Sequence, residues 1–262
     1  MKAFRNIAIV GSGNLAEALA AAVAQLDDIR LTIAARNTAR GRELAAKCRA
    51  EYVPTDAPME DIELCIIAVS DSAIGSVAAS LHLPDSAVVA HTSGATPFDI
   101  LPGRFAGRGA FYPFQTFTAG REVDFARIPL FVEGSDEATA AALEAFAGRL
   151  SRSVARADSA TRRKIHLAGV FACNFANHMF NIGNKIVRSA SLDFDVLRPL
   201  IAETAAKALA SDDPAAVQTG PAVRGDLNSQ QRHLELLADA APELSEIYKQ
   251  ISISIWETSR KI

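Results

Sequence analysis

Two glycines, separated by one serine, are the first residues of the chain whose spacing indicates a specific chemistry. The stretch Gly11–Ala16 reads GSGNLA, follows a run of apolar residues and opens a helix-forming segment. It fits G-x-G-x-x-[GA], which in a strand–turn–helix context binds a dinucleotide. Gly11 permits a tight turn, and Gly13 lets the backbone approach a pyrophosphate at the positive end of the helix. The alternative is an ordinary turn without a ligand. We expect cofactor contacts from Gly11, Ser12, Gly13, Asn14 and Leu15.

The end of the next strand-like run indicates which dinucleotide would bind. Folds that bind NAD usually carry an acidic residue there, but this chain has Ala35-Arg36-Asn37-Thr38. A guanidinium pairs with a 2′-phosphate, which an acidic residue would repel. The alternative is an ordinary surface arginine. We therefore predict that the cofactor is NADP(H) and that Arg36 and Asn37 contact it.

Two further strand-like runs end in small polar residues. Val69-Ser70 closes one run, and His91-Thr92-Ser93 closes the other. Ligands of doubly wound sheets lie beyond the carboxyl ends of the strands. Val69, Ser70 and Thr92 are thus predicted to contact the cofactor, and Ser93 to bind substrate. A histidine at a strand end, such as His91, is more often structural.

A long helical segment over residues 160–190 carries a histidine and several asparagines. At about 100° per residue, His166 and the asparagines fall within an arc of roughly 80°. Neutral amides suit a partly enclosed polar surface, which is either a substrate cleft or a structural interface. We predict His166 as general acid or base and Asn174 as the residue that holds a substrate carbonyl or imine. The arc comprises His166, Asn174, Asn177, Asn181 and Asn184. The opposite face is predicted to form core and comprises Phe171, Phe175, Met179, Ile182 and Ile186.

The order of elements predicts an α/β domain followed by an all-helical one. Apolar strand-like runs alternate with helical patterns up to about residue 157, and only helical patterns follow. Continuous apolar strands are typical of parallel strands buried on both faces, so the first part is expected to be a doubly wound parallel sheet. We predict domains at residues 1–157 and 158–262. The expected strands are 5–10, 30–35, 64–69, 87–91, 129–133 and 152–157.

Composition excludes several classes of function. The chain has 262 residues, a net charge of −3 and three cysteines without CxxC spacing. These values argue against nucleic-acid binding, a disulfide framework and a zinc site. No stretch approaches the 18 apolar residues that a membrane span needs. We expect no metal, no membrane contact and a cytoplasmic location.

The motifs together resemble a known family: NADP-dependent oxidoreductases with a Rossmann-like N-terminal domain and an uncharacterised helical C-terminal domain. Its relatives include pyrroline-5-carboxylate reductase, ketopantoate reductase and the β-hydroxyacid dehydrogenases. The resemblance implies NADP chemistry, a helical domain like that of 6-phosphogluconate dehydrogenase, and a homodimer. The Lys-x-x-x-Asn pair of β-hydroxyacid dehydrogenases is absent, because Val170 stands four residues before Asn174. The last three of the segments that carry the resemblance are the more specific, and they include the substrate-binding candidates Gln115 and Arg224. The segments are residues 11–16, 69–71, 91–94, 112–117, 166–174 and 220–226.

The leading functional hypothesis is therefore a reductase or dehydrogenase. It would transfer a hydride between NADP(H) and a small carbonyl, imine or hydroxy-acid-type substrate held between the domains. A second hypothesis is a non-catalytic NADP-binding sensor, which needs the same glycine loop. A third is an S-adenosylmethionine methyltransferase, which usually needs an acid where Arg36 stands. The sequence specifies neither the substrate nor the direction of the reaction.

Overall fold

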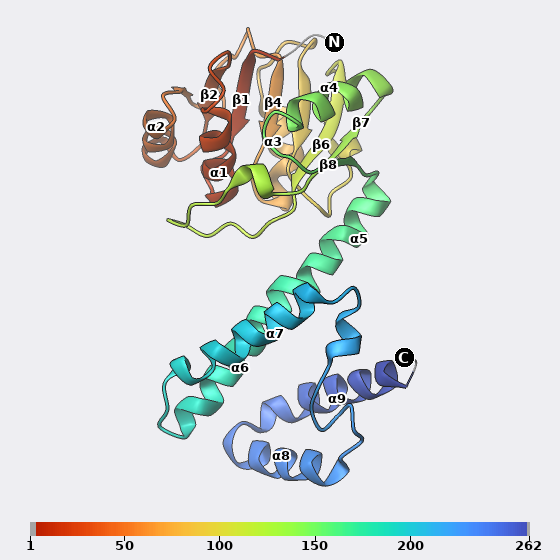
Figure 1. The fold of residues 1–262 in the computed structure, drawn as a ribbon. Coiled ribbons are helices and arrows are strands. Elements are labelled where there is room, and N and C mark those ends of the chain that lie inside the picture. Colours follow the sequence, from red (N-terminus) through yellow and green to blue (C-terminus); the bar gives the residue numbers. More distant parts are fainter. Residues whose placement is uncertain (1–3, 261–262) are drawn as a thin grey trace. The chain divides into compact units, whose positions relative to one another are not determined.

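The computed structural model describes residues 4–260 (Figure 1). The chain forms two compact units that divide between Cys173 and Asn174. The first unit contains every strand of the described residues and the helix that follows them. The change in sequence character at residue 157 thus marks the end of the strands, whereas the compact units divide later, inside the long helical segment.

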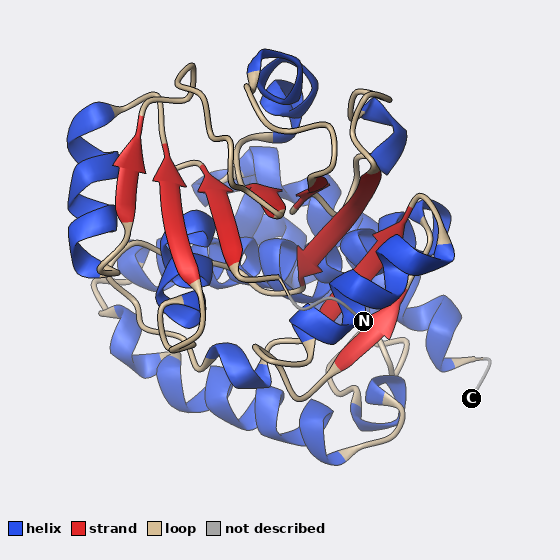
Figure 2. Cartoon of the chain, turned by 90° about the horizontal axis from the view of Figure 1, so that it is seen from above, coloured by secondary structure: helices blue, strands red, loops and turns tan. Residues whose placement is uncertain are grey.

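The first unit is built on an eight-stranded sheet with the order β3-β2-β1-β4-β5-β6-β7-β8. Strands β1 to β6 are all parallel, β7 is antiparallel to β6, and β8 is parallel to β7. Figure 2 shows the strands in red. This is the predicted doubly wound sheet, which is parallel except where β7 pairs with β6. The strands are β1 (Asn6–Val10), β2 (Arg30–Ala34), β3 (Glu51–Val53), β4 (Leu64–Ile67), β5 (Val88–His91), β6 (Gly107–Pro113), β7 (Leu130–Gly134) and β8 (Val154–Arg156).

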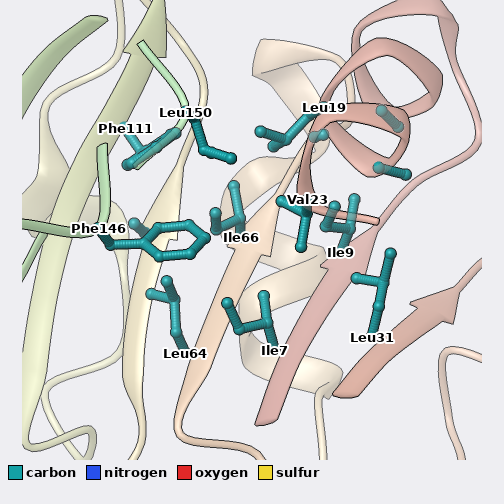
Figure 3. Close-up of a cluster of buried hydrophobic side chains, with 14 of the residues drawn as sticks. Ile7, Ile9, Leu19, Val23, Leu31, Leu64, Ile66, Phe111, Phe146 and Leu150 are labelled. Atoms are coloured by element: carbon teal, nitrogen blue, oxygen red, sulfur yellow. The ribbon is translucent and has the colours of Figure 1, made fainter. Parts of the chain in front are cut away.

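Alternate residues of β1, β2, β4 and β5 enter two separate hydrophobic clusters, one on each face of the sheet. Ile7 and Ile9 of β1 pack with helices α1 and α4, as the close-up in Figure 3 shows. Ala8 and Val10 enter the opposite cluster with α3. Because both faces are covered, the strands read as continuous apolar runs. The helices of this unit are α1 (Asn14–Val23), α2 (Thr38–Lys47), α3 (Ile74–Ser80), α4 (Glu137–Ala147) and α5 (Ser159–Gly169).

Strands β3 and β6 are absent from the sequence-based prediction, and the reversal of β7 was not foreseen. Strand β6 begins Gly-Arg-Gly, which does not resemble a buried β-branched run. Its glycines allow close packing instead, since a β-carbon on Gly107 would lie 2.6 Å from the Thr139 hydroxyl and one on Gly109 2.6 Å from Leu143. Helix α4 therefore lies directly on the strand. Strand β3 is only three residues long and half exposed.

The second unit is entirely helical over its described residues. It consists of α6 (Ala176–Ser189), α7 (Arg198–Ala210), α8 (Leu227–Ala240) and α9 (Ser245–Ser259), with short 3₁₀ turns at Phe194–Val196, Pro214–Val217 and Pro242–Leu244. Between residues 174 and 260, only Ala222 and Ser252 are buried in the single chain. Phe171 and Phe175, which were predicted to form core, are 63% and 47% exposed. That prediction is wrong for the isolated chain.

A π-helical segment, Val170–Phe175, joins α5 to α6. Its backbone bonds span five residues instead of four, so more residues are needed for each turn. The step of 100° per residue does not hold across this segment. The calculated arc therefore does not extend from His166 across this segment, whereas Asn177, Asn181 and Asn184 all lie on the regular helix α6. Short π segments of this kind frequently occur at functional sites.

A buried arginine attaches α5 to the sheet. Arg162 is fully buried and pairs with Glu133 of β7. It also donates from Nε to the Ser93 carbonyl at 3.1 Å and from Nη2 to the Thr96 carbonyl at 2.6 Å. The backbone N–H of Ser159 donates to the same Glu133 carboxylate at 2.9 Å. Strand β7, the turn after β5 and the first turn of α5 are thus held by one ionic cluster.

We predict that Arg162→Met destabilises the protein by about 3–5 kcal/mol, because it leaves the Glu133 carboxylate buried without its cation. Urea denaturation followed by circular dichroism measures the change. Arg156→Met is the matched control, since Arg156 forms an exposed pair with Glu137, and surface pairs contribute little. Equal losses of stability in the two variants would contradict the prediction.

Candidate cofactor and active site

A cleft of about 680 Å³ opens at the carboxyl edge of the sheet, where β1, β2 and β4 end. This volume is in the range of small-molecule sites. Of the predicted cofactor contacts, nine line this cleft: Gly11, Ser12, Gly13, Asn14, Leu15, Arg36, Asn37, Val69 and Ser70. The cleft also includes residues that the sequence reasoning missed: Thr55, Ala73, Ser76, Val77 and Ser80.

The two glycines of the loop have different roles. Gly11 has a φ of +134°, and a β-carbon there would collide with the carbonyl oxygen of Ala68. Gly13 caps α1 without a side-chain hydrogen bond, and a β-carbon there would meet nothing within 4 Å. Gly11 is therefore required by the fold, whereas Gly13 keeps open space next to the free N–H groups of the helix. Such a cradle suits a phosphate.

Two arginines lie beside the glycine loop. Arg36 lines the cleft, is exposed, and makes no hydrogen bond or ion pair with any residue from 4 to 260. Arg40 donates to the Asn14 side chain at 3.3 Å, and the Asn14 amide donates to the Phe117 carbonyl at 3.1 Å. Asn37 accepts a hydrogen bond from the Arg40 backbone and caps α2. The guanidinium of Arg36 is therefore available to a ligand phosphate.

A second polar cluster lies farther along the same edge of the sheet, where β5 and β6 end. The Tyr112 hydroxyl on β6 is 3.0 Å from Nδ1 of His166 on α5, and their ring centroids are 6.1 Å apart. Gly94 lies against both, because a β-carbon there would be 2.8 Å from the Tyr112 oxygen and 2.9 Å from the His166 β-carbon. Burial raises the pKa of Tyr112 to about 12, the Asp71 carboxylate adding to this rise. His166 is half-buried, and Tyr112 was not among the predicted site residues.

His91 is buried at the end of β5, and its Nε2 has no hydrogen-bond partner among the described residues. Burial lowers its pKa to about 4, and the Arg162 guanidinium adds to this decrease. Its Nδ1 accepts a hydrogen bond from the backbone N–H of Ser93 at 3.2 Å. The hydrogen bond at Nδ1 fits the structural role expected from the sequence, whereas the partnerless Nε2 does not add to it.

Thr92 and Ser93 are turned into the protein. Both are buried, and neither lines the cleft. The Thr92 hydroxyl donates to the Ile67 carbonyl at 3.4 Å. The Ser93 hydroxyl donates to the Thr96 hydroxyl at 2.9 Å and accepts from the backbone N–H groups of Ala95 and Thr96. The geometry gives both hydroxyl groups a structural partner.

The remaining predicted residues are exposed. Gln115 accepts a hydrogen bond from the backbone of its neighbour Thr116 at 2.9 Å. Asn174 lies in the π-helical segment at the start of the second unit, and Arg224 lies in a turn of that unit. Asn174, Gln115 and Arg224 therefore stay predictions as substrate-binding residues.

Comparison with known proteins places the chain in a family. A 38% identical crystal structure, described as a "putative NADP oxidoreductase" from Bacteroides fragilis, matches with a TM-score of 0.86 and covers 97% of this chain and 98% of its own. Residues 6–94 match the family model "NADP oxidoreductase coenzyme F420-dependent". Residues 128–255 match a domain of unknown function, DUF2520. The chain belongs to the NADP oxidoreductase family.

More distant structures share the fold of this NADP oxidoreductase. A reductive aminase from Aspergillus terreus, in complex with NADPH and ethyl levulinate, is 15% identical with a TM-score of 0.72, over 99% of this chain and 95% of its own. A 1-pyrroline-5-carboxylate reductase from Streptococcus pyogenes is 12% identical with a TM-score of 0.59, over 98% of each chain. No protein with a curated description matches the chain. The predicted likeness to pyrroline-5-carboxylate reductase is confirmed at the level of the fold.

NADP(H) is the cofactor of this oxidoreductase, as predicted. The residues present fit it, because Gly13 leaves space for the pyrophosphate and Arg36 leaves a free cation for the 2′-phosphate. Within residues 4–260 no three His, Cys, Asp or Glu side chains gather as metal ligands would. In the same range no helix has the length and apolar character needed to cross a bilayer.

We predict that Arg36→Asp weakens NADPH binding about ten- to a hundredfold, because a charge-assisted contact contributes about 1.5–3 kcal/mol. NADH affinity should change much less, since NADH lacks the 2′-phosphate. Calorimetry with both cofactors measures the two constants. The matched control is Arg42→Asp, which changes the charge by the same amount. Arg42 stacks over Tyr52 and does not line the cleft. Equal NADPH and NADH affinities in the unmodified protein would refute the prediction.

Proposed function

We propose that the protein transfers a hydride between NADP(H) and a small compound with a polar double bond, such as a carbonyl or an imine, or the corresponding hydroxy acid. The observation that carries the proposal is the pair of His166 and Tyr112 at the same sheet edge as the cofactor cleft. When bound, the nicotinamide supplies the hydride. The chain's own residues then bind the cofactor, orient the substrate and provide a proton.

The glycine loop and Arg36 hold the phosphates of the cofactor. Strand β4 ends between the two clusters, since the sheet order is β2-β1-β4-β5-β6. A cofactor whose adenosine end lies near Arg36 and whose phosphates lie near Gly13 would direct its nicotinamide toward β5. The substrate would then lie beside His166. This placement follows the general rule that ligands of open α/β sheets bind beyond the carboxyl ends of the strands.

His166 is the residue that we propose as proton donor. Reduction adds a hydride to the carbon of the double bond and a proton to its oxygen or nitrogen, and solvent restores the proton to the enzyme. Nε2 of His166 makes no hydrogen bond to the described residues, whereas Nδ1 is engaged by Tyr112. One ring nitrogen is thus free for substrate.

The names of two structural neighbours support the substrate class. The reductive aminase was crystallised with ethyl levulinate, which contains a ketone, and the reductase is named for 1-pyrroline-5-carboxylate, which contains a C=N bond. The alternative function, a non-catalytic NADP-binding sensor, would need only the cofactor cleft. The buried ionic cluster that holds His166 in place favours the enzyme, because a sensor would not need a positioned acid.

We expect His166→Ala to lower single-turnover hydride transfer by 10²–10⁴-fold, the usual contribution of a general acid. NADPH affinity should stay unchanged, because His166 does not line the cofactor cleft. Stopped-flow oxidation of NADPH with a panel of keto acids, cyclic imines and deazaflavins identifies a substrate and then measures the rate.

The control for this experiment is His82→Ala, which removes an exposed histidine just after α3. Full turnover in His166→Ala would show that the histidine is structural. A protein that binds NADPH tightly yet oxidises it with no compound of the panel would favour the sensor instead.

We further propose that the protein is a homodimer formed by its helical unit. Residues 174–260 bury almost nothing in the single chain, which is unusual for a folded unit of this size. An apolar groove of about 350 Å³ lies between α6, α8 and α9, and is lined by Met179, Ile182 and Leu237. A second copy would cover these surfaces. Exposed apolar side chains include Phe180, Ile186, Leu192, Val196, Leu200, Leu209, Leu227, Leu236, Ile253 and Trp256.

Light scattering should therefore give about twice the monomer mass of 27.8 kDa. The melting temperature should rise with protein concentration, because association stabilises the folded state by mass action. A mass of one chain at every concentration, with a constant melting temperature, would contradict the proposal.

A further inference from the structure

The hydroxyl group of Tyr112 has one hydrogen-bond partner among the described residues, and that partner is Nδ1 of His166 at 3.0 Å. Tyr112 is only 9% exposed. A buried phenol needs an acceptor for its hydrogen, and a neutral imidazole accepts through only one of its two nitrogens. If Nδ1 carried a proton, the phenol hydrogen would have no acceptor among the described residues. The satisfied arrangement has Tyr112 donating to Nδ1.

The surroundings hold this arrangement in place. Gly94 lies against both the phenol ring of Tyr112 and the β-carbon of His166, with no room for a β-carbon of its own. One turn later, Gly169 passes close to Phe114, whose ring would lie 2.6 Å from an added β-carbon. Arg162, one turn before His166, is fixed by Glu133 and by two backbone carbonyls. The approach of α5 to the end of β6 is therefore fixed at three successive turns.

We infer that Tyr112 is a positioning residue that places the proton of neutral His166 on Nε2, so that Nε2–H is the group available to the substrate. This inference rests on the proposed function. In this tautomer Nε2–H is a hydrogen-bond donor and Nδ1 is occupied. A donor stabilises the negative charge that develops on a carbonyl oxygen or imine nitrogen during reduction.

The raised pKa of Tyr112, about 12, is consistent with this role, because the phenol then keeps its hydrogen throughout the neutral range. The substrate class follows from the same geometry. The compound must present an oxygen or nitrogen that accepts a hydrogen bond, next to the carbon that receives the hydride.

The test is ¹⁵N NMR of histidine-labelled protein with NADPH bound, at about pH 8.5, above the ordinary pKa of histidine. The His166 signals are assigned by their loss in His166→Asn. We expect a pyrrole-type Nε2 and a pyridine-type Nδ1. In Tyr112→Phe the ratio of the Nε2–H to the Nδ1–H form should fall about two- to tenfold, the effect of one hydrogen bond.

The chain offers a matched control. In the second unit the Tyr248 hydroxyl is 2.8 Å from Nδ1 of His233. Tyr248→Phe removes the same kind of bond and should alter the signals of His233 while leaving those of His166 unchanged. A proton on Nδ1 of His166 in the unmodified protein would overturn the inference. So would a tautomer ratio that stays the same in Tyr112→Phe.

Kinetics separate this inference from the proposed function. With a substrate from the panel, Tyr112→Phe should lower the rate of reduction about two- to tenfold and leave NADPH affinity unchanged. The same substitution should have no further effect in a His166→Ala background, since Tyr112 acts through His166. An additive loss in the double variant would overturn the positioning role. If His166→Ala itself keeps full activity, the proposed function fails, whatever the tautomer.

Discussion

The buried ion pair between Arg162 and Glu133 is the interaction on which the candidate active site depends. Arg162 and His166 are four residues apart on one α-helix, so they share a face, and fixing the first fixes the second. The guanidinium also holds the carbonyls of Ser93 and Thr96, so one side chain sets the distance between the helix and the turn. Since a buried charge without its partner is costly, alternative positions of α5 are disfavoured.

The sheet topology places Glu133, the partner of Arg162, close to Tyr112, the partner of His166. His91, Ala110 and Glu133 lie in one row across β5, β6 and β7, although β7 runs in the opposite direction to its neighbours. Tyr112 stands two residues farther along β6, toward the carboxyl edge. The same edge carries the glycine loop and Arg36 at the ends of β1 and β2. A single edge of one sheet thus supplies both the phosphate cradle and the candidate acid.

The cofactor cleft could be predicted from the sequence because its signals are local. A glycine loop between a strand and a helix and an arginine at a strand end are each recognisable within about 30 residues. The pair of Tyr112 and His166 could not be found in this way, since the two residues are 54 positions apart and meet only through β6, which its glycines concealed. Helical periodicity failed between His166 and the asparagines of α6 for a different reason: a constant angular step cannot anticipate the π-helical segment that lies between them. Ser93 illustrates a third limit, because a hydroxyl at a strand end is as suited to closing a turn as to binding a ligand.

Gly94 shows how little freedom this arrangement leaves to mutation. The residue carries no functional group, yet the phenol of Tyr112 and the side chain of His166 approach each other across the space that it leaves empty. Every other amino acid brings a β-carbon, so any codon change that alters Gly94 would push the two rings apart or displace the helix. A lineage could exchange the residues around the pocket one at a time and so acquire new substrates. At position 94, however, every substitution would disturb Tyr112 and His166, so the spacing of these two residues would be inherited unchanged.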